Sequence, residues 1–393
     1  MAGLQKVRLG NIAYTNQNTY SPKECWQFVN YLDTGNITMN KIDEIQYINT
    51  LTDKLPSRAK RKVKLNSIIY STVRPNQLHY GIIKEQPANF LVSTGFAVID
   101  VDMDKAIPDY IYYILTQQEV TEHLQAIAEQ SVSAYPSIKP SDIEDLEIML
   151  PDKKEQKKIV SILGAIDDKI ELNNAINKNL FEQMQALYKA WFVDFEPFGG
   201  VRPSNWNDTN IYAISNIIYG APFASKLFNT DGLGKPIIRI RDLKEQEFVT
   251  FTTEEHPKGH LIQPGDIVVG MDGEFRPYIW GNEPAWLNQR VCIFENNRPQ
   301  GKAFVLYTIR PLLNKIEQTQ VATTVIHIGK KDFDAFEIAL PDETTLDGFD
   351  SITAPMIEQI VSNRLQNKRL AVLRDTLLPK LMSGELDVSD IDL

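Results

Sequence analysis

The sequence predicts an α/β (α+β) protein with an internal pseudo-two-fold repeat: two mixed α/β domains separated by a pair of long antiparallel, coiled-coil helices. Three observations predict this fold, namely a repeat at a fixed offset of 190 residues, two long apolar seams at helical spacing, and β-rich runs in the segments between them. A chain of 393 residues has room for two or three domains. The boundaries that we expect are 1–150 (first domain), 151–195 (first helix), 196–342 (second domain), 343–383 (second helix) and 384–393 (tail).

The repeat is clearest around a short apolar motif that ends in Pro-Asp. Residues 146–152 read LEIMLPD, and residues 336–342 read FEIALPD, 190 positions later. Over 138–187, fifteen of fifty residues are identical to their partners at this offset, without a gap. Weaker echoes upstream, such as GNIAY at 10–14 and SNIIY at 215–219, occur at shifting offsets. This pattern indicates two diverged units with variable loops, each closed by the same element.

A long helix is expected after each motif. Pro151 and Asp152 supply a helix start, and apolar residues then recur at alternating steps of three and four, as in a heptad seam. In the second copy Pro355 suits a first turn, and Pro379 would fray the helix end. About 40 residues at ~1.5 Å each give a rod of roughly 60 Å. Because a rod that is apolar along one stripe is not stable alone in water, we expect the two copies to pair.

Two asparagines interrupt each seam and bear on how the helices pair. Antiparallel pairing would bring Asn173 near Asn367 and Asn177 near Asn363, and buried Asn pairs would set the register at a cost in stability. Parallel pairing would match the asparagines equally well, so the seam alone leaves the orientation open. We favour the antiparallel pair, because two tandem units related by a two-fold axis place one domain at each end. In the alternative, the asparagines face solvent, and Leu172 and Ile176 fill the seam.

The two domains read as mixed α/β segments. Short β-rich runs include NSIIYSTV and NFLVSTGFAVIDV in the first domain, and KPIIRIRDL and GDIVVGM in the second. The first domain should also contain one amphipathic helix over about 108–130. Its apolar face is expected in the core and carries Ile111, Ile114, Leu115, Leu124 and Ile127.

Composition excludes several classes of protein. No apolar stretch reaches the ~18 residues that a membrane span needs, and the start is no signal peptide, so we expect a cytoplasmic protein without a membrane partner. Cys25 and Cys292 are too far apart in sequence to suggest a disulfide framework or a CxxC metal site. The net charge of -10 argues against nucleic acid, but residues 1–99 carry 12 Lys/Arg against 6 Asp/Glu. One basic lobe in an acidic chain permits phosphate binding at one face.

The motifs of common enzymes are absent from the sequence. It contains no GxxxxGK[ST] phosphate loop, no GxGxxG after a strand and no [DNS]PP[YF] loop of an amino-methyltransferase. In HPKGH at 256–260, the proline and glycine oppose the helix that would make two histidines converge on a metal. Residues 151–157 imitate the PD…ExK pattern of nucleases, but the second copy keeps Asp342 and has Thr345 and Asp347 where Glu155 and Lys157 stand, so we interpret the motif as a helix cap. The sequence therefore predicts no catalytic residue, no metal site and no enzyme.

Clusters of cations are the candidates for contacts with DNA. Six of them occur within eleven residues of the first domain. If each contacted one phosphate, the chain would bind duplex DNA with an affinity that depends strongly on salt. The first-domain candidates are Lys54, Arg58, Lys60, Arg61, Lys62, Lys64 and, on a following turn, Arg74; those of the second domain are Arg239, Arg241, Lys244, Arg276 and Arg290. The alternative is an ordinary solvated surface. If the DNA interpretation is correct, replacing residues 60–62 by alanine weakens binding broadly.

These features together resemble a known family. The string LEIMLPDKKEQKKIVSILGAIDDKIELNNAINKNLFEQMQALYKAWF at 146–192 is similar to the helix that closes each half of the specificity subunit of type I restriction–modification enzymes. Four further segments also match sequence motifs of the family. They are the DFEPF that follows this string, the STVRPN of the first unit, the GDIVVGMDGEFRP of the second and the terminal LRDTLLPKLMSGEL. The resemblance covers essentially the whole chain. One departure is Thr345-Leu346, which stands where the first helix has Glu-Gln, so docking there is expected to differ in detail.

The resemblance implies a function in DNA recognition. Each domain would be a target-recognition domain that reads one half of an asymmetric, bipartite site on double-stranded DNA, and the helices would set the spacing. Two modification (methyltransferase) subunits would dock on the chain, bind S-adenosylmethionine and methylate adenine at N6. Restriction (motor/nuclease) subunits, with ATP and Mg²⁺, would cleave unmethylated DNA. The chain itself would hold no cofactor and carry no catalysis.

Two alternatives belong to other classes. A decoy or scaffold specificity chain from a mobile element would capture the modification subunits of another system, and its docking and DNA-reading surfaces would look the same in sequence. A nuclease or methyltransferase with unrecognised motifs would be active as an isolated chain with Mg²⁺ or S-adenosylmethionine. Neither the DNA target nor the base-reading side chains follow from the sequence, because recognition depends on side-chain geometry in diverged loops.

Overall fold

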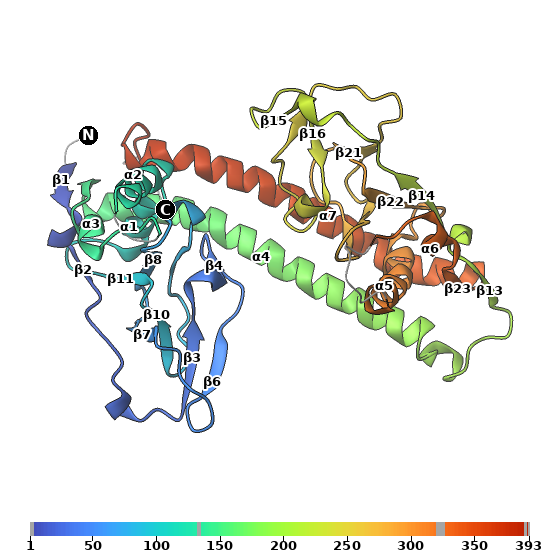
Figure 1. Cartoon of the computed structure of the whole chain (residues 1–393), viewed down its shortest axis with the longest axis horizontal. Coiled ribbons are helices and arrows are strands. Elements are labelled where there is room, and N and C mark those ends of the chain that lie inside the picture. The colour runs from blue at the N-terminus through green and yellow to red at the C-terminus, as the bar shows by residue number, and fades with distance from the viewer. Residues whose placement is uncertain (1–3, 132–134, 320–326, 389–390, 392–393) are drawn as a thin grey trace. The chain divides into compact units, whose positions relative to one another are not determined.

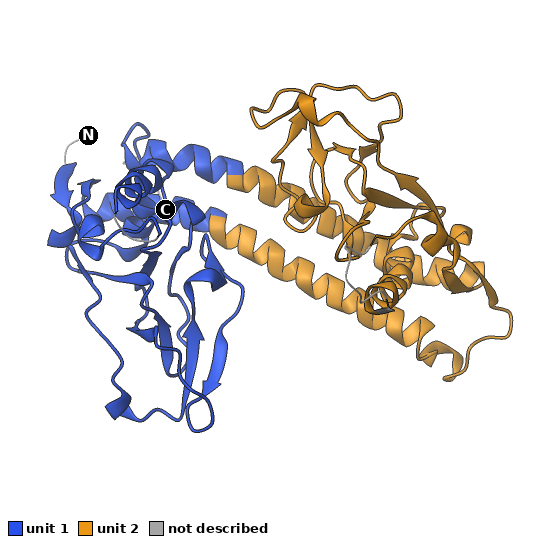
Figure 2. Ribbon diagram, in the orientation of Figure 1, with its two compact units in different colours: residues 1–166, 372–393 blue, residues 167–371 orange. Residues whose placement is uncertain are grey.

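The computed structural model describes residues 4–131, 135–319, 327–388 and 391, and it divides into two compact units (Figures 1 and 2). Unit 1 comprises residues 1–166 and 372–393, and unit 2 comprises residues 167–371. Each unit contains one of the two predicted α/β domains and segments of both long helices. No helix in the described ranges has the length and apolar character that crossing a membrane requires.

The two long helices are α4 (Lys153–Phe192) and α7 (Glu343–Met382), each 40 residues long. Both begin directly after the repeated Pro-Asp. The Asp152 carboxylate accepts a hydrogen bond from the Glu155 amide at 2.9 Å, and Asp342 accepts one from the Thr345 amide at 3.0 Å. These bonds satisfy amides that have no partner within the helix, so the interpretation of the Pro-Asp motif as a cap is confirmed.

The expected position of one proline in the second helix was wrong. Because α7 begins at Glu343, Pro355 lies in its interior rather than in its first turn, whereas Pro379 lies in the last turn of a helix that ends at Met382. A proline removes one backbone hydrogen bond from a helix. Tertiary packing offsets this loss here, since Ile357, Ile360 and Leu381 close to the two prolines are buried.

Within unit 2 the two helices pair antiparallel. The Asn363 side-chain amide donates to the Asn177 carbonyl oxygen at 2.9 Å, and Asn173 donates to the Asn367 oxygen at 2.8 Å. Asn173, Asn177 and Asn363 are buried, whereas Leu172 is 53% exposed. The expected asparagine contacts are therefore confirmed, and the alternative that the preceding apolar residues fill the seam is wrong.

The asparagine pair gives a direct test of this register. Replacing Asn363 by leucine leaves the buried Asn177 amide without its partner, and we expect the free energy of unfolding to fall by about 1–3 kcal/mol. Replacing Asn177 and Asn363 together by leucine should recover most of this loss, because no buried polar group is then left unpaired. Urea denaturation of the full chain measures both variants. Equal losses in the single and double variants would contradict the pairing.

Unit 1 contains two four-stranded sheets. One is antiparallel throughout and has the strand order β2-β11-β8-β9, and the other has the order β6-β3-β10-β7 with β3 and β10 parallel. Their bounds are β2 Ala13–Thr15, β11 Phe96–Val101, β8 Ile68–Ser71, β9 Tyr80–Ile82, β6 Gln46–Asn49, β3 Phe28–Leu32, β10 Phe90–Ser93 and β7 Ala59–Lys62. Two short pairs complete the strands: β1 (Gln5–Arg8) with β12 (Glu147–Leu150), and β4 (Ile37–Thr38) with β5 (Lys41–Ile42).

Unit 2 repeats most of this topology, with one strand more in its second sheet. Its antiparallel sheet has the order β14-β22-β19-β20, and its second sheet, β15-β17-β16-β21-β18, again contains one parallel pair, β16 with β21. The bounds are β14 Ser215–Tyr219, β22 Val291–Asn296, β19 Ile267–Gly270, β20 Pro277–Ile279, β15 Phe228–Asn229, β17 Phe251–Thr252, β16 Lys235–Ile238, β21 Ala285–Leu287 and β18 Leu261–Ile262. As β1 pairs with β12 in unit 1, so β13 (Asn207–Asn210) pairs with β23 (Glu337–Leu340).

Individual hydrogen bonds repeat with the topology. The Ile138 amide donates to the Thr72 carbonyl at 2.9 Å, and the Ile328 amide donates to the Met271 carbonyl at the same distance. The duplication inferred from the helices therefore extends through the strand order of both α/β domains, although little sequence identity is left there.

Shorter helices cover the sheets: α1 (Pro108–Leu115), α2 (Gln118–Glu129) and α3 (Pro140–Glu144) in unit 1, and α5 (Lys302–Thr319) and α6 (Lys330–Asp334) in unit 2. The single helix expected over 108–130 was wrong, because it is broken into α1 and α2 at Thr116 and Gln117. The Thr116 hydroxyl donates to the Tyr113 carbonyl at 3.1 Å at this break. The apolar face was correct, since Ile111 and Leu124 belong to the core of the unit.

Candidate nucleic-acid interface

The six-cation run of unit 1 lies on β7 and the loops on either side of it. β7 is the last strand of its sheet and pairs with β10, and on its other side it forms an isolated bridge from Arg61 to Thr19. Because side chains of a strand point alternately to opposite faces, the run cannot present all its charges together. Lys54, Arg58, Lys60 and Lys64 are exposed, whereas Arg61 and Lys62 are partly buried.

Two of these cations form ion pairs within the unit, and a third, Arg61, is partly buried with its Nε atom unpaired. Lys62 pairs with Glu24, and its ammonium nitrogen lies 5.1 Å from the centroid of the Trp26 ring. The hydrogen bond from Lys62 lowers the pKa of the Glu24 carboxyl. Lys64 lies 3.6 Å from the buried Asp100 carboxylate, and burial lowers the pKa of Arg61.

The other three, Lys54, Arg58 and Lys60, are open to solvent and lie in no ion pair within 4.0 Å among the described residues, although the charge of Arg58 helps to lower the pKa of the Asp33 carboxyl. These are the side chains of the run that are best placed to meet phosphate oxygens.

Two exposed apolar side chains lie near this run in the sequence. Leu51, in the loop between β6 and β7, is 75% exposed. Tyr47 on β6 is 67% exposed and stacks on Phe28 with ring centroids 5.5 Å apart. The sequence carried no signal that distinguished these two side chains from core residues.

Arg74 is presented by a turn. Its backbone has a φ of 49°, in the left-handed region that non-glycine residues rarely adopt, and its amide donates to the Pro136 carbonyl at 2.9 Å. The guanidinium lies 5.1 Å from the centroid of the Tyr135 ring, which favours a cation–π contact. The exposed Arg74 is therefore held on the surface of unit 1 away from its core.

In unit 2 the candidates do not form a single run. Arg239 is used internally, since it bonds to Asp242 and to the Thr250 hydroxyl. Arg290 lies 3.0 Å from a ring nitrogen of His327 and 3.8 Å from Asp272. These contacts engage both side chains within the unit, although the Arg290 side chain is still 53% exposed.

The remaining cations of unit 2 are exposed and only weakly paired. Arg241 lies 4.0 Å from Asp242, Lys244 lies 3.8 Å from Glu245, and Arg276 lies 3.2 Å from Glu274. Exposed ion pairs of this kind contribute about 0–1 kcal/mol, so a phosphate group competes with them easily. Arg241, Lys244 and Arg276, together with the partly engaged Arg290, are thus the accessible cations predicted for unit 2.

The described ranges hold no group of three or more His, Cys, Asp or Glu that could bind a metal ion. His256 packs on Phe223 with ring centroids 5.2 Å apart, and the Gly259 amide donates to the His256 carbonyl at 2.8 Å. The HPKGH segment is therefore a loop closed by a turn, as expected. Cys25 is exposed, and burial raises the pKa of the Cys292 thiol.

The fold and the comparisons with known proteins define the class to which the chain belongs. A family model described as the type I restriction modification DNA specificity domain matches residues 1–182 and 203–373, and the chain belongs to this family. Its duplicated domains and paired helices are those of a specificity subunit of a type I restriction–modification system.

Several individual proteins are similar along most of their length. The chain is 25% identical over 432 residues to the type I restriction enzyme HindI specificity subunit of Haemophilus influenzae. The alignment covers 91% of this chain and 94% of the relative. It is also 25% identical over 416 residues to the type I restriction enzyme MjaIX specificity subunit of Methanocaldococcus jannaschii, and this alignment covers 99% of this chain and 94% of the relative. The S subunit of a type I restriction–modification system from M. genitalium has the same fold, with a TM-score of 0.56 at 15% identity over 96% of each chain.

Proposed function

We propose that this chain is the DNA sequence-recognition subunit of its complex, and that each α/β domain reads one half of an asymmetric, bipartite target. The observation that carries the proposal is the duplicated topology: the two domains share the strand order of the antiparallel sheet and one parallel pair in the second sheet, but differ in their loops and charges. A common scaffold with different surfaces suits the reading of two different half-sites. Phosphate contacts from the exposed cations would position the DNA, and base-edge contacts would specify it.

The paired helices would set the gap between the two half-sites. Each helix has 40 residues and a length of roughly 60 Å at ~1.5 Å per residue. The buried asparagine bonds support this role, because they oppose sliding of one helix along the other. The same helices would dock two modification subunits.

The chemistry would reside in the partner subunits. The modification subunits would bind S-adenosylmethionine, extrude one adenine per half-site and methylate it at N6. Restriction subunits, with ATP and Mg²⁺, would cleave unmethylated DNA. In this proposal the present chain acts in the cytoplasm and contributes neither cofactor nor catalytic group.

Co-expression with the modification subunit encoded beside it, in a host that lacks DNA methylation, tests this proposal. Mapping N6-methyladenine by long-read sequencing should show a bipartite motif with a fixed gap, and the motif should vanish when this chain is omitted. A stable complex that methylates nothing would instead support the alternative function, a decoy chain that captures modification subunits. Failure to form any complex would contradict the docking role of the helices.

A further inference from the structure

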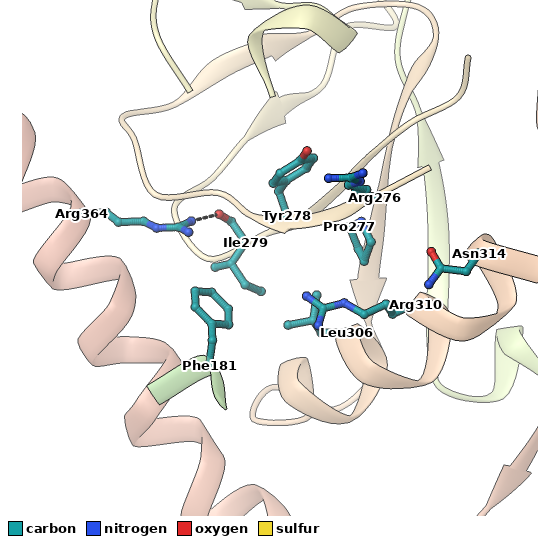
Figure 3. A pocket seen from close by; sticks show the side chains of 9 residues that line it. All are labelled: Phe181, Arg276, Pro277, Tyr278, Ile279, Leu306, Arg310, Asn314 and Arg364. Carbon is teal, nitrogen blue, oxygen red and sulfur yellow. Dashed lines mark hydrogen bonds between the residues drawn. The ribbon is translucent and has the colours of Figure 1, made fainter. Parts of the chain in front are cut away.

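Unit 2 contains a cavity of about 450 Å³ whose polar lining is dominated by three arginines (Figure 3). Arg276 comes from the strand end at β20, Arg310 and Asn314 come from α5, and Arg364 comes from α7. No carboxylate belongs to the lining. A cavity of this size can enclose a small ligand or one segment of a larger one.

Arg364 is built into the wall of this cavity. Its guanidinium donates to the Ile279 carbonyl at 2.5 Å and lies 5.5 Å from the centroid of the Phe181 ring (Figure 3). Burial lowers the pKa of Arg364, and no described carboxylate pairs with it. One carbonyl satisfies only part of the donor capacity of a guanidinium, so this cation is left without a counter-charge in a poorly solvated place.

The backbone makes room for Arg364. A Cβ atom added to Gly281, just after β20, would lie 2.2 Å from Cδ of Arg364. Only glycine therefore lets the chain pass the arginine at this distance. This close approach holds the guanidinium at the edge of the cavity.

Arg310 and Asn314 supply further donors from one face of α5, since residues four apart are neighbours on a helix. Arg310 donates to the Gln185 oxygen at 3.3 Å and lies 5.3 Å from the Tyr307 ring centroid. The Asn314 side chain makes no hydrogen bond with another described residue. Arg276 is paired only with the exposed Glu274.

From this arrangement we propose that the cavity binds a phosphoryl group. Guanidinium groups present paired N–H donors that match the oxygens of a phosphate, and the Asn314 amide adds a neutral donor. The phosphoryl group belongs either to the backbone of bound DNA or to a free nucleotide. The first source rests on the proposed DNA-recognition function, and the second does not.

The test uses the full chain carrying Arg310→Gln together with Asn314→Ala, which leaves Arg364 and its contacts in place. Arg369→Gln is the matched control, because Arg369 is an exposed arginine of α7, 4.0 Å from Glu283 and outside the lining. A second variant, Arg276→Gln, changes only the exposed rim of the cavity. Binding of duplex DNA is measured by fluorescence anisotropy between about 50 and 200 mM salt, and binding of inorganic phosphate and of ADP by calorimetry.

If a DNA phosphate occupies the cavity, the double variant should lose about ten-fold in DNA affinity, and the salt slope should fall by about one. If the source is a free nucleotide, ADP binding should be lost while DNA affinity and salt slope are unchanged. Either result supports the site when Arg369→Gln behaves as wild type. The proposal is overturned if the double variant and Arg276→Gln bind DNA, phosphate and ADP as the wild type does. It is also overturned if the control Arg369→Gln loses as much affinity as the double variant. In that case the methylation map of the wild-type chain tells the two proposals apart. If the map shows the bipartite motif, only the phosphoryl site is refuted, and the proposed function stands.

Discussion

Replacing Lys54, Arg58 and Lys60 together by alanine will weaken the binding of duplex DNA by on the order of 100-fold at about 0.1 M salt. Each of these exposed side chains lacks an ion pair within the described protein, so each is free to displace a counterion from a phosphate. The slope of log K against log salt should fall by about three, since each phosphate contact contributes about 0.9. Anisotropy titrations with duplex DNA over a series of salt concentrations measure both quantities.

The control for this variant removes the same charge from another part of unit 1. Lys153, Lys154 and Lys157 in the first turns of α4 are exposed, and their replacement by alanine should leave the salt slope unchanged. Equal losses in the two triple variants would show that only net charge matters. The replacement of residues 60–62 by alanine, which the sequence suggested, is a poorer test of phosphate contacts, because removing Lys62 also breaks its ion pair with Glu24.

Replacing Phe349 by alanine will lower the free energy of unfolding of unit 2 by about 3–5 kcal/mol. This side chain is fully buried where α7 meets α4, with ring centroids 4.9 Å from Phe192 and 5.9 Å from Trp191. Alanine removes these aromatic contacts and leaves a cavity that the rigid helix pair cannot close. Urea denaturation followed by tryptophan fluorescence reports mainly on unit 2, which holds four of the five tryptophans.

Two further substitutions bracket this effect. Phe349→Leu keeps most of the apolar volume and should cost clearly less than Phe349→Ala. Leu172→Ala on the exposed face of α4 should change the stability by no more than about 0.5 kcal/mol. A loss below about 1 kcal/mol for Phe349→Ala would mean that the aromatic cluster does not hold the two helices together.

The long helices and their pairing were predictable because they depend on local and repeated patterns. The seam that includes Ile159 and Leu163 repeats at helical spacing, and both residues are buried as expected. The asparagines could be matched because the repeat offset places them at equivalent positions in the two copies. The orientation of the pair needed the structure, since both directions matched asparagine with asparagine.

The candidate interface was predictable only as a set of residue types. Lys62 and Lys64 look like their neighbours in sequence, but their partners Glu24 and Asp100 come from distant strands or loops. Arg364 carried no signal, because only the folded chain brings it beside Ile279 and Phe181. The break between α1 and α2 was missed for a similar reason, since the apolar period continues across it.

By itself, the sequence determined the duplication, the two long helices with their Pro-Asp starts, and the asparagines that meet between them. These features follow from identity at a fixed offset and from a periodicity that acts over a few turns. Only the tertiary structure decided which of the predicted cations stay exposed, how strands from distant segments are ordered, and where arginines converge on one cavity. Those outcomes depend on contacts between residues far apart in sequence, and a local pattern carries no record of them.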